Sequence, residues 1–598
     1  MGEIVFCDLG NVCEPKDNIS ELRRRDKWAS VAYETSSYQG TMLVSMYDAV
    51  AEDVLLDPKL KGMYKIYVGL YGYFNTENIV DIKLSKDESF VHMATSFERN
   101  FSEQYVEEVF WRASEMEGQQ VVIGKHLSKT YSASAMIAWI RFVPMTEEEI
   151  IAYEADCEKQ KNKRIYATND MHGMLCYYDM STREAWRNVV QEYIHSDVEW
   201  LAMEYLLNDG ELSYVDVENF MFATANDKSF SKRLTLDYSQ DMLRDLVKMG
   251  HRNGLKMCIS LRICEWNFEF PHDKIAFERK FWTNNKALRC VDRDGQIIEY
   301  LSFAHKEVRD YLVEQFVKMA QTGCDAVQVL FSRGWPYVLF ERPFLELFES
   351  RYHTDARCLA MDDERIVAVK CEIMTDFMKQ LRQALDQVRE TSRVELHAKV
   401  LFSMYDCKYM GLDLEEWAKL GLVDAIVSDE RRIREVLDES VWMDETREKI
   451  DLKKYTDYVR CAKEDVIRYD YDTFFAPFPD SKGVLRGPVD QRERISEFMQ
   501  LEKQYGVTVY IEIMPRRMST NRIKEKALEI YDCGCEHIGL WDTYSRVMRK
   551  VEWSMWKRIG HKEELKTFSD GEGDLYRRVR ILKIGGKDVS RYRPIWGG

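Results

Sequence analysis

VTVYIEIMPRR, residues 507–517, is the most informative stretch of this chain. Its β-branched and apolar residues predict a buried strand, which ends in a carboxylate, a proline and two arginines. Because side chains alternate along a strand, Tyr510, Glu512 and Met514 share one face. A carboxylate on a buried strand is costly unless it is paired or used. The stretch therefore predicts a strand with a paired or functional acid, Glu512, near its carboxyl end.

The same pattern recurs in HIGLWDTYSR, residues 537–546, where a strand again ends in an acid, Asp542. From residue 164 onward, predicted strands alternate with helical segments. The predicted strands are 164–169, 198–207, 255–261, 324–331, 394–402, 423–428, 507–513 and 536–541. Eight strand–helix units predict a parallel sheet closed into a (β/α)8 TIM barrel, with a large open α/β sheet as the alternative.

Helical periodicity supports these strand boundaries. Apolar residues recur with a 3.6-residue period at 239–252, 306–322, 366–388, 491–505 and 520–532. Several of these helices are followed by a glycine, the residue that commonly ends a helix in a left-handed conformation. These are Gly254, Gly323, Gly506 and Gly534.

Residues 1–150 have a different pattern of predicted elements. Short predicted strands at 63–70, 79–84, 106–111, 119–123 and 135–143 are separated by turn residues, which predicts an N-terminal all-β sandwich, resembling a jelly roll. A charged helical run at 145–162 links this accessory domain to a barrel domain at 164–560. We expect the last segment, 561–598, to pack on the barrel as a C-terminal extension. Long segments at 208–237, 265–304 and 429–490 follow strands and would wall the barrel mouth.

Composition limits the classes of partner. A net charge of −17 over 598 residues opposes binding to nucleic acid or anionic membranes. No window is apolar enough to span a membrane, and the N-terminus has no signal-peptide pattern. The 14 cysteines are scattered without metal-ligand spacing, as expected of free thiols in a reducing compartment. We therefore expect a cytoplasmic protein, and oligomerisation with further copies of the chain stays open.

Polar and aromatic side chains gather where the predicted strands end, and in barrel enzymes this end holds the chemistry. The candidates are Asn169, Asp170, His172, Glu204, Asn208, Arg262, Glu265, Trp266, Gln328, Arg333, Trp335, His397, Lys399, Asp429, Glu512, Arg516, Trp541 and Asp542. Several carboxylates with arginines and tryptophans fit a carbohydrate site, because paired acids cleave glycosidic bonds and aromatic rings hold sugars. No nucleotide-binding, zinc or nucleophile-elbow motif occurs, so neither a cofactor nor a metal is expected.

Several candidates have a structural alternative. Arg262 and Arg333 would equally form an ion-pair layer that neutralises barrel acids, and Asp429 opens a charged run that fits a solvated helix start. Lys399 is either a Schiff-base lysine or an ion-pair partner, and His172 is either a base or a hydrogen-bonded loop histidine. These alternatives stay open at the level of sequence.

Over residues 164–598 the chain resembles bacterial family-10-like glycosyl hydrolases, which are (β/α)8 barrels with sandwich appendages. The likeness lies in LKMCISLRICEW (255–266), LSFAHKEVRDY (301–311), DAVQVLFSRGWP (325–336), LDLEEWAKLGLVDAIV (412–427), VYIEIMPRRM (509–518), HIGLWDTYSR (537–546) and DVSRYRPIWGG (588–598). The resemblance implies a glycoside hydrolase with a carbohydrate substrate. One departure lies on the fourth strand, where Gln328 and Leu330 replace two acids of the family pattern, whereas Arg262, Arg333, Glu512 and Asp542 match.

The sequence and the resemblance together predict a glycosidase in which Glu512 is the nucleophile or base. Glu265 or Asp429 would then be the proton donor, and burial of Glu265 near Trp266 would raise its pKa. Because two family acids are replaced, a barrel that binds sugar without hydrolysing it is the alternative, and a lyase or isomerase on the same fold is another.

Overall fold

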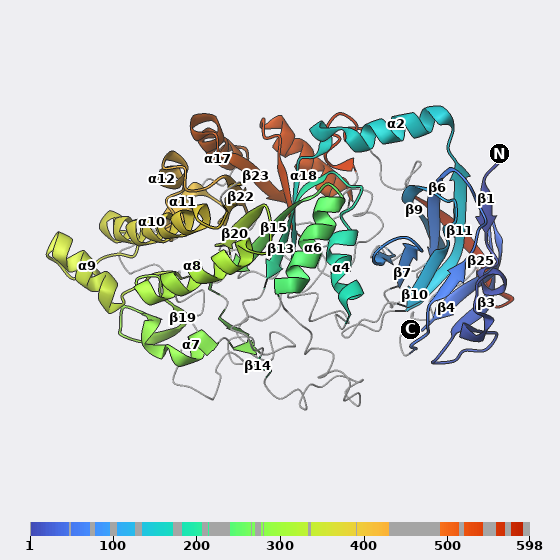
Figure 1. Ribbon diagram of the computed structural model, residues 1–598, viewed down its shortest axis with the longest axis horizontal. Helices are drawn as coiled ribbons and strands as arrows, with labels where there is room; N and C mark the ends of the chain where they lie inside the picture. The colour runs from blue at the N-terminus through green and yellow to red at the C-terminus, as the bar shows by residue number, and fades with distance from the viewer. Residues whose placement is uncertain are drawn as a thin grey trace, which may run out of the picture.

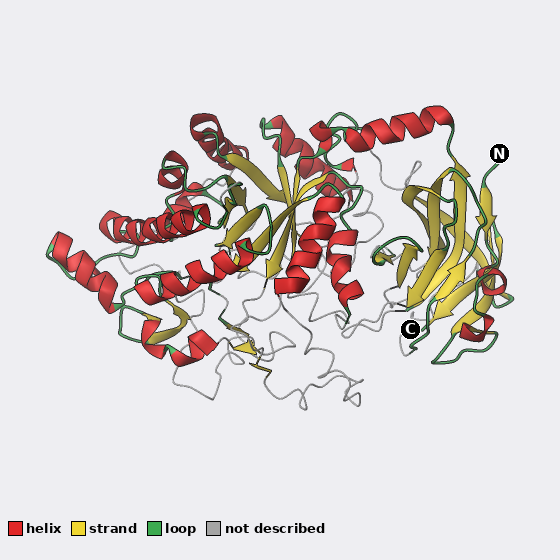
Figure 2. Cartoon of the chain, viewed as in Figure 1, coloured by secondary structure: helices red, strands yellow, loops and turns green. Residues whose placement is uncertain are grey.

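The computed structural model describes residues 2–46, 49–71, 78–95, 104–125, 134–171, 182–205, 213–214, 240–264, 266–268, 277–278, 280–332, 336–389, 392–429, 491–513, 520–541, 558–567 and 576–589. They form an α/β barrel on one side and an all-β domain on the other (Figure 1). Figure 2 shows helices around the barrel strands, whereas the second domain consists mostly of strands.

The barrel is a closed ring of parallel strands. Its members in order are β12 (Ile165–Asn169), β13 (Val198–Tyr205), β15 (Lys256–Arg262), β20 (Ala326–Leu330), β21 (Glu395–Val400), β22 (Ala425–Ser428), β23 (Thr508–Ile513) and β24 (Ile538–Trp541). Each strand pairs with the next, and β24 closes the ring on β12. The predicted closed barrel is confirmed, and the open sheet is wrong.

Amphipathic helices pack their apolar faces on the barrel strands. The main ones are α4 (Arg183–Gln191), α6 (Gln240–Arg252), α8 (Lys306–Ala320), α10 (Glu364–Asp386), α17 (Gln491–Tyr505) and α18 (Thr520–Asp532). Shorter helices are α7 (Lys280–Asn284), α9 (Arg342–Tyr352), α11 (Met404–Tyr409), α12 (Leu414–Lys419), η4 (Lys286–Leu288) and η5 (Ala356–Cys358). Gly254 and Gly506 follow α6 and α17 with φ of 73° and 74°, the left-handed conformation that was predicted.

Short strands form two small sheets in the segments between the barrel elements. β14 (Ser213–Tyr214), β16 (Asn267–Phe268) and β17 (Phe277–Glu278) form one small sheet, and β18 (Arg289–Val291) and β19 (Ile297–Leu301) form another. Most of 208–237, and all of 429–490 except Asp429, lie outside the described residues. Within the described part of the chain, no helix has the length and apolar character needed to cross a bilayer.

The all-β domain contains two sheets. Its N-terminal strands are β1 (Ile4–Phe6), β2 (Ile19–Ser20), β3 (Trp28–Thr35), β4 (Gln39–Ser45), β5 (Val54–Leu56), β6 (Met63–Tyr71), β7 (Ile79–Leu84), β8 (Val91–Ala94), β9 (Tyr105–Glu115), β10 (Val121–Lys125) and β11 (Ala135–Pro144). The helices α1 (Leu9–Val12) and η1 (Lys16–Asn18) lie between them. The smaller sheet has the order β5-β10-β7-β8, and the predicted all-β character is confirmed.

The larger sheet is completed by the C-terminal end of the chain. β25 (Tyr576–Ile584) pairs antiparallel with both β9 and β3, so the strands β3-β4-β11-β6-β9-β25 form a closed ring, and β26 (Lys587–Asp588) extends it (Figure 1). One core cluster inside the ring takes residues from each of these strands, including Val579 and Ile581 from β25. We expected all of 561–598 on the barrel, and His561 does contact Asp197 before β13. β25 and β26 instead belong to the all-β sheet, because the alternating apolar and charged residues of β25 suit a strand with one buried face.

The two domains are linked by a helix and a docked hairpin. The predicted charged run is the helix α2 (Glu147–Glu158), which starts with a capping box between Thr146 and Glu149. The β7–β8 hairpin packs on α4, where Asn188 Nδ2 lies 3.0 Å from His92 Nε2 and Asn188 Oδ1 accepts a hydrogen bond from Ser89.

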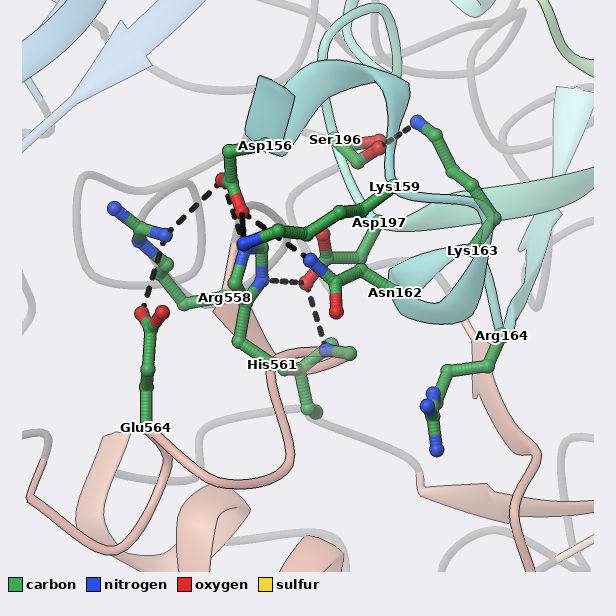
Figure 3. A network of polar contacts seen from close by, with 12 residues as sticks. Asp156, Lys159, Asn162, Lys163, Arg164, Ser196, Asp197, Arg558, His561 and Glu564 are labelled. Carbon is green, nitrogen blue, oxygen red and sulfur yellow. Dashed lines mark hydrogen bonds and ion pairs between the residues drawn. The ribbon is translucent and has the colours of Figure 1, made fainter. Parts of the chain in front are cut away.

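A buried histidine joins three chain segments at the amino end of the barrel (Figure 3). His561 Nδ1 lies 2.8 Å from Asp197, which precedes β13, and its Nε2 lies 2.9 Å from Asp156 in α2. The Gly560 amide also donates to Asp197 at 2.7 Å. Burial would lower the pKa of His561, but its hydrogen bonds to the two carboxylates raise the pKa above the ordinary value.

Candidate functional site

The inward-facing side chains at the carboxyl ends of the barrel strands form the candidate site. In parallel barrels such side chains stack in layers, each contributed by alternate strands. Lys399 on β21 contacts Thr168 on β12 and Glu512 on β23, which are the fifth, first and seventh strands of the ring. Leu330 on β20 packs with Trp541 on β24, the fourth and eighth strands.

Lys399 and Glu512 form an ion pair in the barrel interior. Their Nζ and Oε1 atoms are 2.5 Å apart, and the two side chains are fully buried. The Lys399 ammonium also donates to Thr168 Oγ1 at 3.3 Å and lies 3.3 Å from the centre of the Trp541 ring. Lys399 is therefore an ion-pair partner in this structure, one of the two roles that the sequence left open.

Three carboxylates act electrostatically on Lys399. Burial lowers the pKa of its ammonium, whereas the charges of Glu512, Asp429 and Glu204 raise that pKa; burial prevails, so the pKa lies below the ordinary value. Asp429, at the end of β22, is itself buried, and its backbone amide donates to the Val400 carbonyl at 3.0 Å. Of these three acids, Glu512 has the largest effect on the pKa of Lys399.

Arg262 at the end of β15 holds two further acids. Its Nη2 lies 2.8 Å from Asp170 Oδ2 and 2.6 Å from Glu204 Oε2, and its Nε donates to Glu204 at 2.7 Å. All three side chains are buried. Arg262 thus forms the ion pairs expected of a structural layer, and the charge of Glu204 also raises the pKa of Lys399.

Gln328 and His397 lie one layer deeper than expected. Gln328 Oε1 accepts from Ser260 at 2.7 Å, and its Nε2 donates to the Tyr166 hydroxyl at 2.9 Å. That hydroxyl lies 3.0 Å from His397 Nδ1, whose other nitrogen lies 2.9 Å from Glu395. This network lies among the side chains that fill the barrel. The structure therefore does not bring Gln328 and His397 to the candidate acids Asp170, Glu204 and Glu512. Two residues of rise along each strand separate the two layers.

Two other predicted residues point elsewhere. Asn169 is the last residue of β12 and lies between Thr168 and Asp170, whose side chains face inward. Its Nδ2 donates to the Tyr193 hydroxyl at 3.4 Å. Trp266 is buried and packs with Phe281 and Tyr311, at ring-centre distances of 6.3 and 6.2 Å. The first contact joins the end of β12 to Tyr193, just after α4, and the second places Trp266 in an aromatic cluster.

Several predicted site residues lie outside the described residues. They are His172, Asn208, Glu265, Arg333, Trp335, Arg516 and Asp542. Sequence reasoning missed Thr168, which contacts Lys399, and Tyr166, which anchors the deeper layer. Strand alternation places both on the face of Asp170, which is the signal that would have found them.

Three acids of this site, Asp170, Glu204 and Glu512, are held by the cations Arg262 and Lys399. Among the residues with described placement, no group of three or more His, Cys, Asp and Glu side chains has the arrangement of a metal site. The arrangement instead provides carboxyl groups at fixed positions beside an ammonium and a guanidinium, which suits acid–base or nucleophilic chemistry.

No protein-family model matches the chain, and no curated protein does. Similar solved structures include the glycoside hydrolase domain of PgaB (BpsB) from Bordetella bronchiseptica, with a TM-score of 0.36 and 9% identity over 63% of this chain and 93% of that one. The β-galactosidase from the psychrophilic Marinomonas ef1 has a TM-score of 0.39 and 10% identity over 68% and 62%. The α-galactosidase TtGalA from Thermus thermophilus has a TM-score of 0.33 and 10% identity over 94% and 98%. Identities of 9–10% with TM-scores below 0.5 do not establish a shared family, so the family-10-like resemblance stays a prediction.

Proposed function

We propose that the chain is a glycoside hydrolase that acts on an oligosaccharide or glycoside at the carboxyl end of its barrel. The observation that supports this proposal is the gathering of four buried acids around two cations. Asp170 and Glu204 surround Arg262, and Glu512 pairs with Lys399, whose pKa also responds to Asp429. Glycosidases cleave the glycosidic bond between two carboxyl groups, one ionised and one protonated.

Glu512 is assigned as the nucleophile or base. An ammonium 2.5 Å from its carboxylate stabilises the ionised form, which both roles require. The proton donor must instead be a carboxyl group that is neutral at the working pH. Asp429, beside the same lysine, and Glu265, outside the described residues, are the two candidates for that role.

A panel of aryl glycosides and oligosaccharides, read for released sugar and for thermal shift, tests the proposal. We expect turnover of one member, and we expect Glu512→Gln to lower it by about 10³-fold or more while leaving sugar binding intact. Glu108→Gln is the matched control, because Glu108 is equally buried but is held by Arg141 and Arg577 in the all-β domain. Stabilisation by sugars without any turnover would support the non-hydrolytic binding barrel instead.

A lyase that works through a Schiff base on Lys399 is a second candidate. Burial lowers the pKa of this amine, and a lower pKa increases the share of the neutral form, which is the form that adds to a carbonyl. The imine would form between Nζ and the carbonyl carbon with loss of water. Borohydride reduces such an imine to a stable amine, so a mass increase on the Lys399 peptide after treatment with carbonyl sugars would favour the lyase, and its absence together with hydrolysis would favour the glycosidase.

A further inference from the structure

A second buried arginine, Arg494, reaches the strand ends that carry the candidate acids. It is the fourth residue of α17, and its side chain is 0% exposed. Its Nε donates to the Phe402 carbonyl at 2.6 Å, just after β21. Its Nη2 donates to Ser428 Oγ at 2.7 Å and to the Asp429 carbonyl at 3.0 Å, at the end of β22.

The rest of the guanidinium is held in place as well. Nη1 donates to Gln491 Oε1 at 3.0 Å, and the guanidinium lies 4.3 Å from the centre of the Phe402 ring. A planar fork with several N–H groups can bind several oxygens in a fixed geometry, which a lysine ammonium cannot reproduce. Arg494 therefore fixes the end of β22 to the end of β21 from outside the barrel.

The same two strands are tied at their other ends by a different arginine. Arg382 of α10 donates from Nη2 to the Val394 carbonyl at 2.9 Å, before β21, and from Nη1 to Asp424 at 3.3 Å, before β22. Arg382 is also buried. The two arginines thus make comparable contacts with the same strand pair. Arg494 binds the carboxyl ends of β21 and β22, near Lys399 and Asp429, whereas Arg382 binds their amino ends.

We propose that Arg494 is a positioning residue for the catalytic end of the barrel: it holds the backbone of Asp429, and so the Asp429 carboxylate, at a fixed place two residues beyond Val427, the register partner of Lys399. This inference rests in part on the proposed glycosidase function. The Asp429 amide donates to the Val400 carbonyl, and the Asp429 carbonyl accepts from Arg494. Because the backbone is held on both sides, the direction of the Asp429 side chain depends on these two hydrogen bonds.

The test compares Arg494→Lys with Arg382→Lys in the full-length chain. Hydrogen–deuterium exchange, read by mass spectrometry, should speed up at residues 427–429 and 399–403 in Arg494→Lys, and at residues 394–396 and 424–426 in Arg382→Lys. On a substrate found with the glycoside panel, Arg494→Lys should lower kcat by about 10-fold to 100-fold with KM changed by less than about twofold, because a small misplacement of a reacting group costs that much. Arg382→Lys should leave kcat unchanged.

A further variant separates a positioning role from loss of folding. In Arg494→Ala, millimolar guanidinium should restore part of the lost kcat, because the ion fits the vacated position, and it should not affect Arg382→Ala. Unchanged exchange at 427–429 in Arg494→Lys overturns the inference whatever the activity, and so does equal loss of kcat in both lysine variants. If the wild-type chain cleaves no glycoside but exchange at 427–429 still rises in Arg494→Lys, the proposed glycosidase function is wrong, whereas the positioning of Asp429 by Arg494 is supported.

Discussion

The Lys399 ammonium and the Glu512 carboxylate meet 2.5 Å apart although their strands are not neighbours. Lys399 pairs in register with Val427, and Val427 pairs with Tyr510, so the two charged side chains reach past β22 inside the ring. Moving two charges into such an interior costs several kcal/mol per ion, which their attraction offsets only with good geometry. The pair is therefore better suited to a functional role than to stability alone.

Removing one partner of this pair should destabilise the protein more than removing both. Lys399→Met leaves the Glu512 charge buried, and Glu512→Leu leaves the Lys399 charge buried, so we expect each to lower the free energy of unfolding by about 3–5 kcal/mol. The double variant should lie closer to the wild type than either single variant. Chemical denaturation of the four proteins gives the coupling energy, and additive effects would contradict the proposed pairing.

The His561 network should make stability depend on pH in a defined direction. Because the pKa of His561 is raised above 6.5 in the folded protein, the protonated imidazole stabilises the fold below pH 6.5, and this contribution is lost as the pH rises through the folded pKa. His561→Gln removes that contribution.

Thermal unfolding of wild type and His561→Gln at several pH values measures this effect. The difference in Tm between the two should be largest in mildly acid solution and should shrink as the pH rises above 6.5. Comparing the pair cancels the other titrating groups, including His92, whose pKa is also raised. A difference that stays constant across this range would show that His561 does not carry the proton between Asp156 and Asp197.

The barrel could be predicted from the sequence because each strand has a recognisable local pattern of residues. β23 and β24 are short apolar runs between helices with clear periodicity, and α17 and α18 begin and end at the predicted residues. Long-range pairing is different: the alternating residues of 576–584 suit a strand, but nothing local shows that this strand closes the all-β ring rather than packing on the barrel. Its place follows from pairing with β9 and β3, hundreds of residues away.

The candidate site could be predicted only in part for a related reason. Strand ends identify Glu512, Lys399, Glu204 and Arg262, but which acid meets which cation depends on the stagger of the strands around the ring. The same stagger places Gln328 in the deeper layer, where it bonds Tyr166, so a residue can lie on an inward face and still be remote from the acids.

Deleting the C-terminal strand should unfold the all-β domain rather than the barrel. Without residues 568–598, β3 and β9 lose their shared partner, and the core cluster loses Val579 and Ile581. We expect a separate low-temperature unfolding transition, or insoluble protein, because two strand edges become free to pair with other chains. Deleting only residues 590–598, which follow β26, should have little effect on the same calorimetric profile.

Restoring an acid on the fourth strand should not create activity. The new carboxylate of a Gln328→Glu variant would lie among Ser260, Tyr166 and His397, away from Glu512, so we expect no gain in hydrolysis. At neutral pH this buried carboxylate lacks the amide N–H that donates to Tyr166 in the wild type, which should cost about 1–3 kcal/mol of stability. Because burial favours the protonated acid, that loss should diminish as the pH falls. Denaturation at acid and neutral pH together with the glycoside panel measures both effects, and faster hydrolysis by this variant would show that position 328 does reach the reacting bond.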